Sequence, residues 1–368
     1  MIKVLVRVDS SLEIGSGHII RCLNLAKKLH SNGFTVAFIC RENVGGYQHL
    51  VLEEGFELIL LATENYEVSP KKEGLQHAAW LPVSQEKDAC DCQDAIDNRT
   101  FDWLIVDHYA LDFRWENLMR SANLRIMVID DLADRKHQCD LLLDQNFYID
   151  MEDRYINLVP KNCLTLLGPQ YLLLDQQYEK YQGIEKIRST PISKILVFFG
   201  STDLTHQTQL VLDAIPHLGK YAVTWDIVVG SNNPKRNAIK NSCDQNENIR
   251  FYYQVRNMSE LIFDADLALG AGGMTGWERC KLGLPSITTI VAVNQIEATE
   301  NAEQLGVCYN LGHYNQVTKS SYINAIHRML EQNEGKLKIM SENCYKIFND
   351  TDALDIPNLL KNYGSDAI

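Results

Sequence analysis

The chain has 368 residues, of which 45% are hydrophobic and 23% are charged, a mixture typical of a globular protein of about two domains. The formal net charge of −13 disfavours nucleic acid as a partner, because an acidic surface repels phosphate backbones. The ten cysteines follow no disulfide spacing, no signal peptide is visible and no apolar run is as long as a membrane span, so we expect a cytoplasmic protein without membrane insertion.

The first half of the chain alternates between predicted strands and helices. Residues 2–8 read as a buried strand, a polar loop runs from Asp9 to Gly17, and apolar residues at helical spacing predict a helix over residues 18–30. Residues 63–83 are polar and irregular and give no prediction. One further helix is expected at residues 112–121, and apolar runs predict strands at 34–39, 57–61, 103–107, 125–130 and 140–143.

A polar stretch at residues 175–193 has no strand pattern and reads as a linker, after which the alternation restarts. Apolar runs then predict strands at 194–199, 223–229, 266–269 and 285–291 and helices at 257–263, 275–282, 295–305, 319–332 and 335–348. We therefore predict two doubly wound α/β domains, residues 1–180 and 190–368, that face a central cleft where a ligand binds.

The loop after the first strand contains Gly15-Ser16-Gly17-His18. Glycines let the backbone turn sharply and approach a ligand, and the amides at the start of a helix favour negative charge. The same positive helix end favours a neutral imidazole at His18, which a general base requires. The residues alone leave open that His18 merely caps the helix. The loop lacks the full G-x-G-x-x-G spacing, which disfavours NAD.

Polar residues also follow two later strands. Asp107 and Tyr109 end the strand at 103–107, where side chains point into the ligand crevice of such sheets, so both are candidates for substrate contacts. Simple polarity at a strand end is the alternative. Asp130 and Asp131 follow the next strand, but no third ligand stands at a suitable spacing, so we predict a structural or substrate-orienting role and no metal site.

The most specific motif is the glycine loop and helix of residues 270–285. A strand leads into the glycines, which suits a pyrophosphate resting on the start of the following helix. Glu278, early in that helix, can accept the hydroxyls of a ribose, or it is simply a solvated glutamate. The predicted ligands of this second site are Gly272, Gly273, Met274, Thr275, Glu278, Asn294 and Gln295.

Together these motifs resemble the UDP-2,4-diacetamido-2,4,6-trideoxy-β-L-altropyranose hydrolases of pseudaminic acid biosynthesis and the spore-coat polysaccharide proteins of the same type. The resemblance covers most of residues 1–310 in the right order. It is carried by VRVDSSLEIGSGHIIRCLNLA at 6–26, IVDHYALD at 105–112, VIDDLADRKHQCDLLLDQN at 128–146, VFFGSTD at 197–203, GAGGMTGWERCKLGLP at 270–285 and VNQ at 293–295.

The resemblance implies a GT-B fold whose C-terminal domain binds UDP while the sugar faces the N-terminal domain. It also implies that water attacks the anomeric carbon with inversion, without a metal or a cofactor. By the same resemblance, His18 is expected to be the catalytic residue and Tyr109 to have a supporting role near the sugar. Glu278 and Asn294 are expected to contact the nucleotide or the sugar. We expect a monomer whose partner is a UDP-sugar.

The chain departs from the family pattern in the glycine loop, where Met274 and Gly276 replace the serines of AGGSTSWE. The phosphate contacts are therefore expected to come from the backbone. Two other functions fit the same motifs: an inverting GT-B glycosyltransferase that uses the same UDP site and base, and a nucleotide-sugar binding protein without catalysis. The sequence shows no basic or amphipathic surface suited to a lipid acceptor, which favours hydrolysis over transfer.

Overall fold

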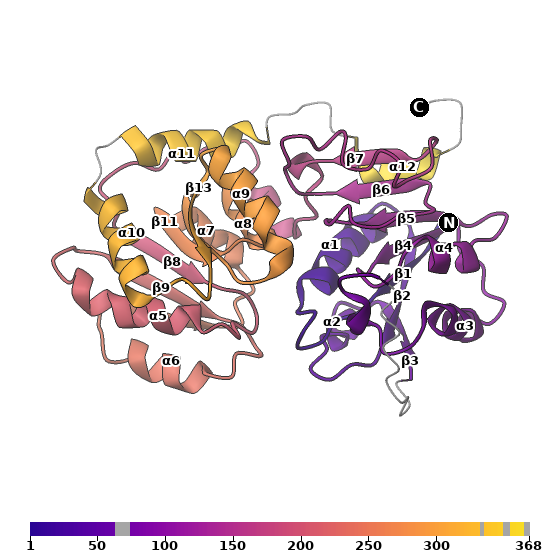
Figure 1. Ribbon diagram of the computed structural model, residues 1–368, viewed down its shortest axis with the longest axis horizontal. Helices are drawn as coiled ribbons and strands as arrows, with labels where there is room; N and C mark the ends of the chain where they lie inside the picture. Colours follow the sequence, from indigo (N-terminus) through magenta and orange to yellow (C-terminus); the bar gives the residue numbers. More distant parts are fainter. Residues whose placement is uncertain (63–73, 332–334, 349–353, 364–368) are drawn as a thin grey trace. The chain divides into compact units, whose positions relative to one another are not determined.

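The computed structural model describes residues 1–62, 74–331, 335–348 and 354–363, so part of the irregular segment, residues 63–73, lies outside the described residues. The chain forms two compact units (Figure 1). The first contains Met1–Asn146, Asp150–Asp175 and Thr351–Ile368, and the second contains Phe147–Ile149 and Gln176–Asp350.

The first unit is built on a seven-stranded parallel sheet in the order β3-β2-β1-β4-β5-β6-β7. Strands β1 and β4 pair directly, with Val8 opposite Asp107, and the strand order reverses between them. In doubly wound sheets ligands bind at this reversal, outside the carboxyl ends of the strands. The strands are β1 (Lys3–Val8), β2 (Thr35–Arg41), β3 (Glu57–Leu61), β4 (Trp103–Asp107), β5 (Arg125–Ile129), β6 (Leu141–Asp144) and β7 (Leu164–Leu167).

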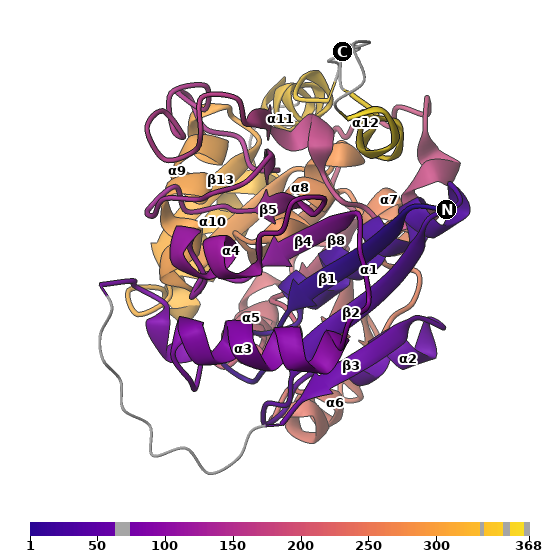
Figure 2. The ribbon, with the colours of Figure 1, turned by 90° about the vertical axis from the view of Figure 1, so that its right-hand side faces the viewer.

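Helices cover both faces of this sheet because successive strand residues point to opposite sides. Val4, Val6 and Val8 of β1 pack with α1 (Gly17–Ser31) and α2 (His49–Glu53). Leu5 packs on the other face with α3 (Gln85–Ile96) and α4 (Phe113–Met119), which Figure 2 shows in front of the strands. Short 3₁₀ helices complete the unit and its exit: η1 (Ala78–Trp80), η2 (Pro169–Tyr171) and η3 (Gln176–Tyr181).

The second unit repeats the plan with six parallel strands in the order β10-β9-β8-β11-β12-β13. Its strands are β8 (Lys194–Phe198), β9 (Thr224–Val229), β10 (Ile249–Tyr253), β11 (Leu267–Ala271), β12 (Ser286–Ile290) and β13 (Cys308–His313). Its helices are α5 (Gln207–Ala214), η4 (Ile215–Leu218), α6 (Arg236–Cys243), α7 (Met258–Asp264), α8 (Met274–Lys281), η5 (Val293–Gln295), α9 (Ile296–Gln304), α10 (Lys319–Glu331) and α11 (Gly335–Lys346). The predicted pair of doubly wound sheets is confirmed.

The end of the chain differs from the predicted domain boundaries. Helix α12 (Ile356–Asn362) belongs to the first unit, although the sequence assigned all of residues 190–368 to the second domain. Ile356, Leu359 and Leu360 are buried in the same core as β1 and α1 (yellow helix beside β6 and β7 in Figure 1). This short helix buries its apolar side chains by packing on the core of the first unit. That packing explains why the end of the chain does not belong to the second unit.

Candidate functional site

The first cluster of predicted site residues gathers at the strand reversal of the first unit. The loop after β1 leads into α1, whose first two residues are Gly17 and His18, and Asp107 ends the adjacent strand β4. Gly15 has a φ of +77°, a left-handed conformation that favours glycine. Apart from its chain neighbours, a Cβ at Gly15 or Gly17 would meet no atom of the described residues within 4 Å, which leaves room for a ligand beside the loop.

Buried ion pairs hold the start of this loop in place. Asp9 accepts hydrogen bonds from the Arg7 guanidinium at 2.5 and 2.9 Å and from the backbone amide of Arg41 at 2.7 Å. Burial alone would raise the pKa of Asp9, but Arg7 and His108 together outweigh it and hold the pKa well below its usual range. Asp88 of α3 bridges the two arginines. The loop therefore starts from a fixed, fully paired network.

His18 forms a close pair with Asp107. Its Nδ1 lies 2.6 Å from Oδ1 of Asp107, and an ionised carboxylate only accepts hydrogen bonds, so Nδ1 carries the proton. The Nε2 atom makes no hydrogen bond within the described part of the chain. The His18 side chain is 9% exposed. The pair therefore leaves Nε2 with a lone pair that can take up a proton.

Arg21, one turn further along α1, fixes the carboxylate of Asp107. Its Nε and Nη2 donate to Oδ2 and Oδ1 of Asp107 at 2.6 and 2.7 Å. Burial favours the neutral form of Asp107, but the charges of Arg21 and His18 outweigh it and hold the pKa well below its ordinary value. Both oxygens of Asp107 are thus engaged by Arg21 and His18, and the residue is 1% exposed. The substrate contact expected of Asp107 stays a prediction.

Tyr109 lies against His18 and connects to the same network. The two rings meet edge to face, with centroids 4.6 Å apart. The Tyr109 hydroxyl donates to Asp131, which also accepts from Arg21 Nη1 at 2.6 Å and from Asn146 Nδ2 at 2.8 Å. Burial and the Asp131 carboxylate raise the pKa of Tyr109 well above its ordinary range, so the phenol stays protonated. Asp131 thus joins Tyr109, Arg21 and Asn146 in one network. The structural or substrate-orienting role expected of it stays a prediction.

Two aromatic residues of the irregular segment complete this site and were not predicted. Trp80, in η1, stacks on Tyr109 with a centroid distance of 5.3 Å and lies 5.7 Å from the His18 ring. His77 contacts both Trp80 and Tyr109, at 4.5 and 5.4 Å. Burial lowers the pKa of His77. Both rings are partly exposed, so they form an aromatic wall beside the candidate base.

The second cluster of predicted residues lies at the strand reversal of the second unit, between β8 and β11. After β11 the chain passes through Gly272 and Gly273, and Gly273 caps α8. A Cβ on Gly272 would lie 2.0 Å from Oγ1 of Thr299, so any other residue here would force Thr299 or the loop to shift. A Cβ on Gly273 would lie 3.3 Å from Nε2 of Gln295, which brings that predicted ligand to the loop.

The remaining predicted ligands lie on the two helices that follow β11 and β12, α8 and η5. Met274 and Thr275 begin α8, and Glu278 on the same helix is 9% exposed. Asn294 lies partly buried in η5 beside Gln295, whose Oε1 accepts from the Val291 amide at 3.1 Å. The structure thus joins Gly272, Gly273, Met274, Thr275 and Gln295 in one glycine-lined site of the second unit.

The described residues contain neither a cluster of metal-binding side chains nor a helix that could span a membrane. Within residues 1–62, 74–331, 335–348 and 354–363, no three histidine, cysteine, aspartate or glutamate side chains are grouped as a metal site requires. Across the same residues, every helix is too short or too polar to cross a bilayer.

Comparison with known proteins finds similarity to a glycosyltransferase domain and to two proteins whose names refer to sugars. The Glycosyltransferase family 28 C-terminal domain matches residues 194–355. The chain is 27% identical over 266 residues to the UDP-2,4-diacetamido-2,4,6-trideoxy-beta-L-altropyranose hydrolase of Campylobacter jejuni, covering 72% of this chain and 82% of that protein. It is 21% identical over 307 residues to the spore coat polysaccharide biosynthesis protein SpsG of Bacillus subtilis, covering 83% and 82%.

Similarity to solved structures identifies the fold of the chain. The spinosyn rhamnosyltransferase SpnG complexed with thymidine diphosphate matches with a TM-score of 0.68 and 15% identity, over 98% of this chain and 99% of that one. The chain has the GT-B fold. Within this GT-B chain, the predicted catalytic residues His18 and Tyr109 follow β1 and β4 of the first unit, and the predicted nucleotide ligands follow β11 and β12 of the second.

Proposed function

We propose that this protein cleaves a UDP-linked 2,4-diacetamido-2,4,6-trideoxy sugar with water, giving the free sugar and UDP. The observation that carries the proposal is the pair of His18 and Asp107, joined at 2.6 Å, with Nε2 of His18 unbonded within the described residues. Such a pair is what a general base needs. The relationship to the Campylobacter hydrolase supports the substrate class and the choice of water as the nucleophile.

In the proposed reaction His18 Nε2 takes a proton from water as the water oxygen attacks the anomeric carbon. The bond from that carbon to the diphosphate oxygen breaks, its electron pair leaves with UDP, and the configuration at the anomeric carbon inverts. UDP is already a stable leaving group, so one base suffices. The positive charge that develops on His18 is stabilised by Asp107, which Arg21 keeps ionised.

We assign the UDP to the second unit. The amides at the start of α8 and the glycines before it suit a diphosphate, because a helix start presents unpaired N–H groups and a positive dipole end. Glu278 is the candidate partner for the ribose hydroxyls, and Asn294 and Gln295 are candidates for further contacts with the nucleotide or the sugar. Met274 carries no hydroxyl, so the backbone would supply the phosphate contacts at this position.

We assign the sugar to the aromatic wall of Trp80 and Tyr109 in the first unit. A trideoxy sugar with acetamido groups presents more C–H and methyl surface than glucose does, and aromatic faces bury such surface well. The stacking of Trp80 on Tyr109 next to His18 supports this assignment. The wall would also keep bulk water away from the reacting carbon.

Glycosyl transfer is the second candidate, and the match of residues 194–355 to a glycosyltransferase domain favours it. The same base would then take a proton from an acceptor hydroxyl instead of water. A nucleotide-sugar binding protein without catalysis is the third function that these motifs allow.

One experiment separates the three functions. The full-length protein is incubated with UDP-2,4-diacetamido-2,4,6-trideoxy-β-L-altropyranose in ¹⁸O-labelled water without any acceptor, and the products are followed by NMR and mass spectrometry. Hydrolysis by the proposed route gives free sugar in equal amount to UDP, with the label on the sugar and the inverted anomer formed first. Label on UDP would contradict attack at carbon.

Variants complete the test. His18→Ala should abolish turnover while UDP binding, measured by calorimetry, is unchanged. Turnover that starts only when a hydroxyl acceptor is added would establish transfer instead. UDP-sugar binding without turnover in either assay would leave the binding function and reject the enzyme.

A further inference from the structure

Arg279 is a buried cation without a carboxylate partner. It lies on α8, is 3% exposed, and no carboxylate of the described residues comes within ion-pair distance of it. Its Nη2 donates to the carbonyl of Ala271 at 2.9 Å, and its Nη1 reaches Oγ1 of Thr275 at 3.5 Å. Its Nε has no hydrogen-bond partner although the atom is buried.

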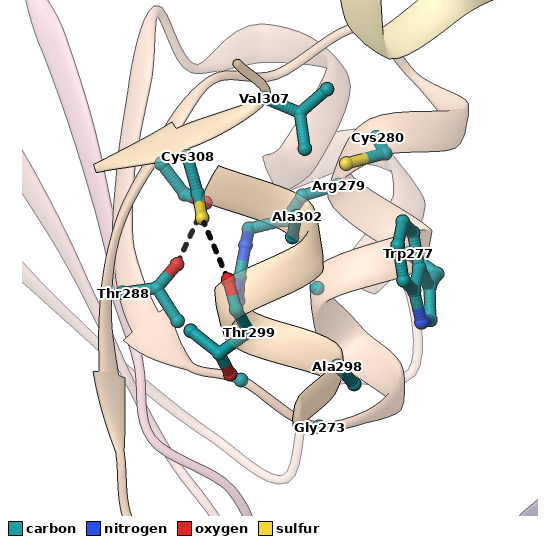
Figure 3. Close-up of a pocket in the computed structure, with 13 residues that line it drawn as sticks. Gly273, Trp277, Arg279, Cys280, Thr288, Ala298, Thr299, Ala302, Val307 and Cys308 are labelled. Atoms are coloured by element: carbon teal, nitrogen blue, oxygen red, sulfur yellow. Dashed lines mark hydrogen bonds between the residues drawn. The ribbon is translucent and has the colours of Figure 1, made fainter. Parts of the chain in front are cut away.

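The guanidinium fills the inner side of the glycine loop. A Cβ on Gly270 would lie 2.5 Å from Nη1, and one on Gly276 would lie 3.6 Å from Nη2. A cavity of about 20 Å³ adjoins the side chain, and Figure 3 shows Arg279 among the residues that line it, with Gly273, Thr299 and Cys308. Thr299 Oγ1 is a second buried polar atom there without a partner in the described chain.

An unpaired buried charge destabilises a protein unless something compensates it. Arginine does not escape by losing its proton, because its pKa starts so high that the burial that lowers it here leaves it charged. The arginines of the first unit illustrate the usual solution, since Arg7 and Arg21 are each bonded to two aspartates. Arg279 stands apart from this pattern, and the loop in front of it is the site assigned to a diphosphate.

We propose that Arg279 is a positioning residue for the diphosphate of the nucleotide. Its charge attracts the anion from behind the loop, and its bond to the Ala271 carbonyl turns that carbonyl inward, away from the anion. The amides of Gly272 and Gly273 are then left to face the phosphates. This inference rests on the proposed assignment of UDP to the second unit, and it names the internal group that makes this site select a diphosphate.

The test compares UDP with uridine, which has the same base and ribose but no phosphate. Binding of each to the full-length protein is measured by calorimetry for wild type, Arg279→Gln, Arg279→Lys and a matched control, Lys281→Met. The control removes a cation from the same helix, in a side chain whose ammonium group lies over the Phe348 ring at 4.7 Å. The measured quantity is the ratio of the uridine Kd to the UDP Kd.

The ratio should fall about tenfold or more in Arg279→Gln, the size expected for losing one charge near a diphosphate in a partly buried site. It should be largely kept in Arg279→Lys and unchanged in Lys281→Met, while uridine binds alike to all four proteins. An unchanged ratio in Arg279→Gln would overturn the proposal. Equal losses of UDP and uridine would also overturn it, because they would indicate a merely structural role.

Folding is checked by the thermal unfolding midpoint of each variant without ligand. If Arg279→Gln does not fold, Arg279→Met takes its place, because it removes the charge without burying an amide. Wild-type protein that binds neither UDP nor uridine would reject the assignment of the nucleotide site itself. Wild-type protein that binds UDP but shows no turnover leaves the comparison of the ratios intact.

Discussion

The carboxylate of Asp107 determines which nitrogen of His18 carries the proton. Asp107→Asn should therefore lower kcat by about 10²–10⁴-fold, the contribution of a positioned general base, with KM and UDP affinity little changed. The new amide places an NH₂ group against either Arg21 or His18. Facing His18, it would move the ring proton to Nε2 and remove the lone pair that water needs.

Asp102→Asn is the matched control for this prediction. It removes the same charge just before the other end of β4, where Asp102 accepts from the backbone amide of Lys3 at 2.7 Å, and an asparagine oxygen can still accept there. Steady-state kinetics of both variants provide the measurement. Equal kcat values for Asp107→Asn and wild type would contradict the role assigned to the pair.

Parts of the candidate site could be predicted from the sequence because they follow strands directly. The loop before His18 and the residues after β4 occupy strand ends, where ligand crevices form. The position of Arg21 could also have been used, because it stands three residues after His18 and the two therefore lie on one helix face. The pairing of His18 with Asp107 could not be deduced, because it depends on which strand lies beside β1. Trp80 belongs to a segment without periodicity, so no pattern pointed to it.

Trp80 tests the assignment of the sugar. Trp80→Ala should raise KM for the UDP-sugar several-fold to about tenfold. The variant loses apolar contacts with the sugar that contribute roughly 1 kcal/mol or more of binding free energy. The Kd of UDP alone should stay unchanged, and Trp80→Phe should keep most of the wild-type KM. Calorimetry and initial-rate kinetics give both constants, and a KM equal to wild type in Trp80→Ala would remove Trp80 from the sugar site.

Among the secondary-structure elements, α12 packs against residues that are far from it in the sequence. It packs on residues of the first unit although it follows the whole second unit in sequence. Trp103 Nε1 donates to the carbonyl of Leu360 at 3.2 Å, and the Tyr363 ring meets the Trp103 ring edge to face. The first unit is thus closed by the last described residues of the chain.

Leu360→Ala should destabilise the first unit by about 2–5 kcal/mol, the usual result of removing a fully buried leucine side chain. Amide hydrogen exchange measured by mass spectrometry should become faster in β1, β4 and α1 and stay unchanged in β8 and β11. Asn358→Ala, on the exposed side of the same helix, is the control. Faster exchange confined to the second unit would contradict this packing.

The three strands that the sequence did not predict, β7, β10 and β13, all lie at the edges of the two sheets. Strands β10 and β13 form the two edges of the second sheet, and most of their residues are only partly buried. An edge strand of this kind shows neither a continuous apolar run nor strict alternation. Strand β7, at an edge of the first sheet, has only four residues. The central strands β1, β4, β8 and β11 are buried on both faces and were predicted within a residue or two.

On the scale of the whole molecule, both units use one strand order and place their candidate sites at the same topological point. They differ in how charge is buried there. In the first unit arginines and carboxylates compensate one another, as in the network of Arg21, Asp107 and Asp131. In the second unit Arg279 has no such partner among the described residues. A network in which cations and carboxylates neutralise one another suits a base that must change its charge. A buried cation without a carboxylate partner suits a site that must hold an anion.

Another buried charge makes the stability of the protein depend on pH. His137 is 3% exposed, its Nδ1 lies 2.6 Å from Oε1 of Glu116, and its Nε2 lies 3.8 Å from Oδ2 of Asp130. Burial alone would lower the pKa of His137, but Glu116 and Asp130 outweigh it and raise the pKa from 6.5 to about 9. The folded protein therefore binds this proton more tightly than the unfolded chain does.

The sign of the effect follows from that difference. A raised pKa in the folded state stabilises the protein fully below pH 6.5, and the contribution is lost as the pH rises through about 9. Its size is about 3 kcal/mol at 1.36 kcal/mol for each pKa unit. The free energy of unfolding, measured by denaturant titration between pH 6 and 10, should fall by about this amount more in wild type than in the double variant Glu116→Gln/His137→Gln. Parallel pH profiles would show that His137 is not charged in the folded protein.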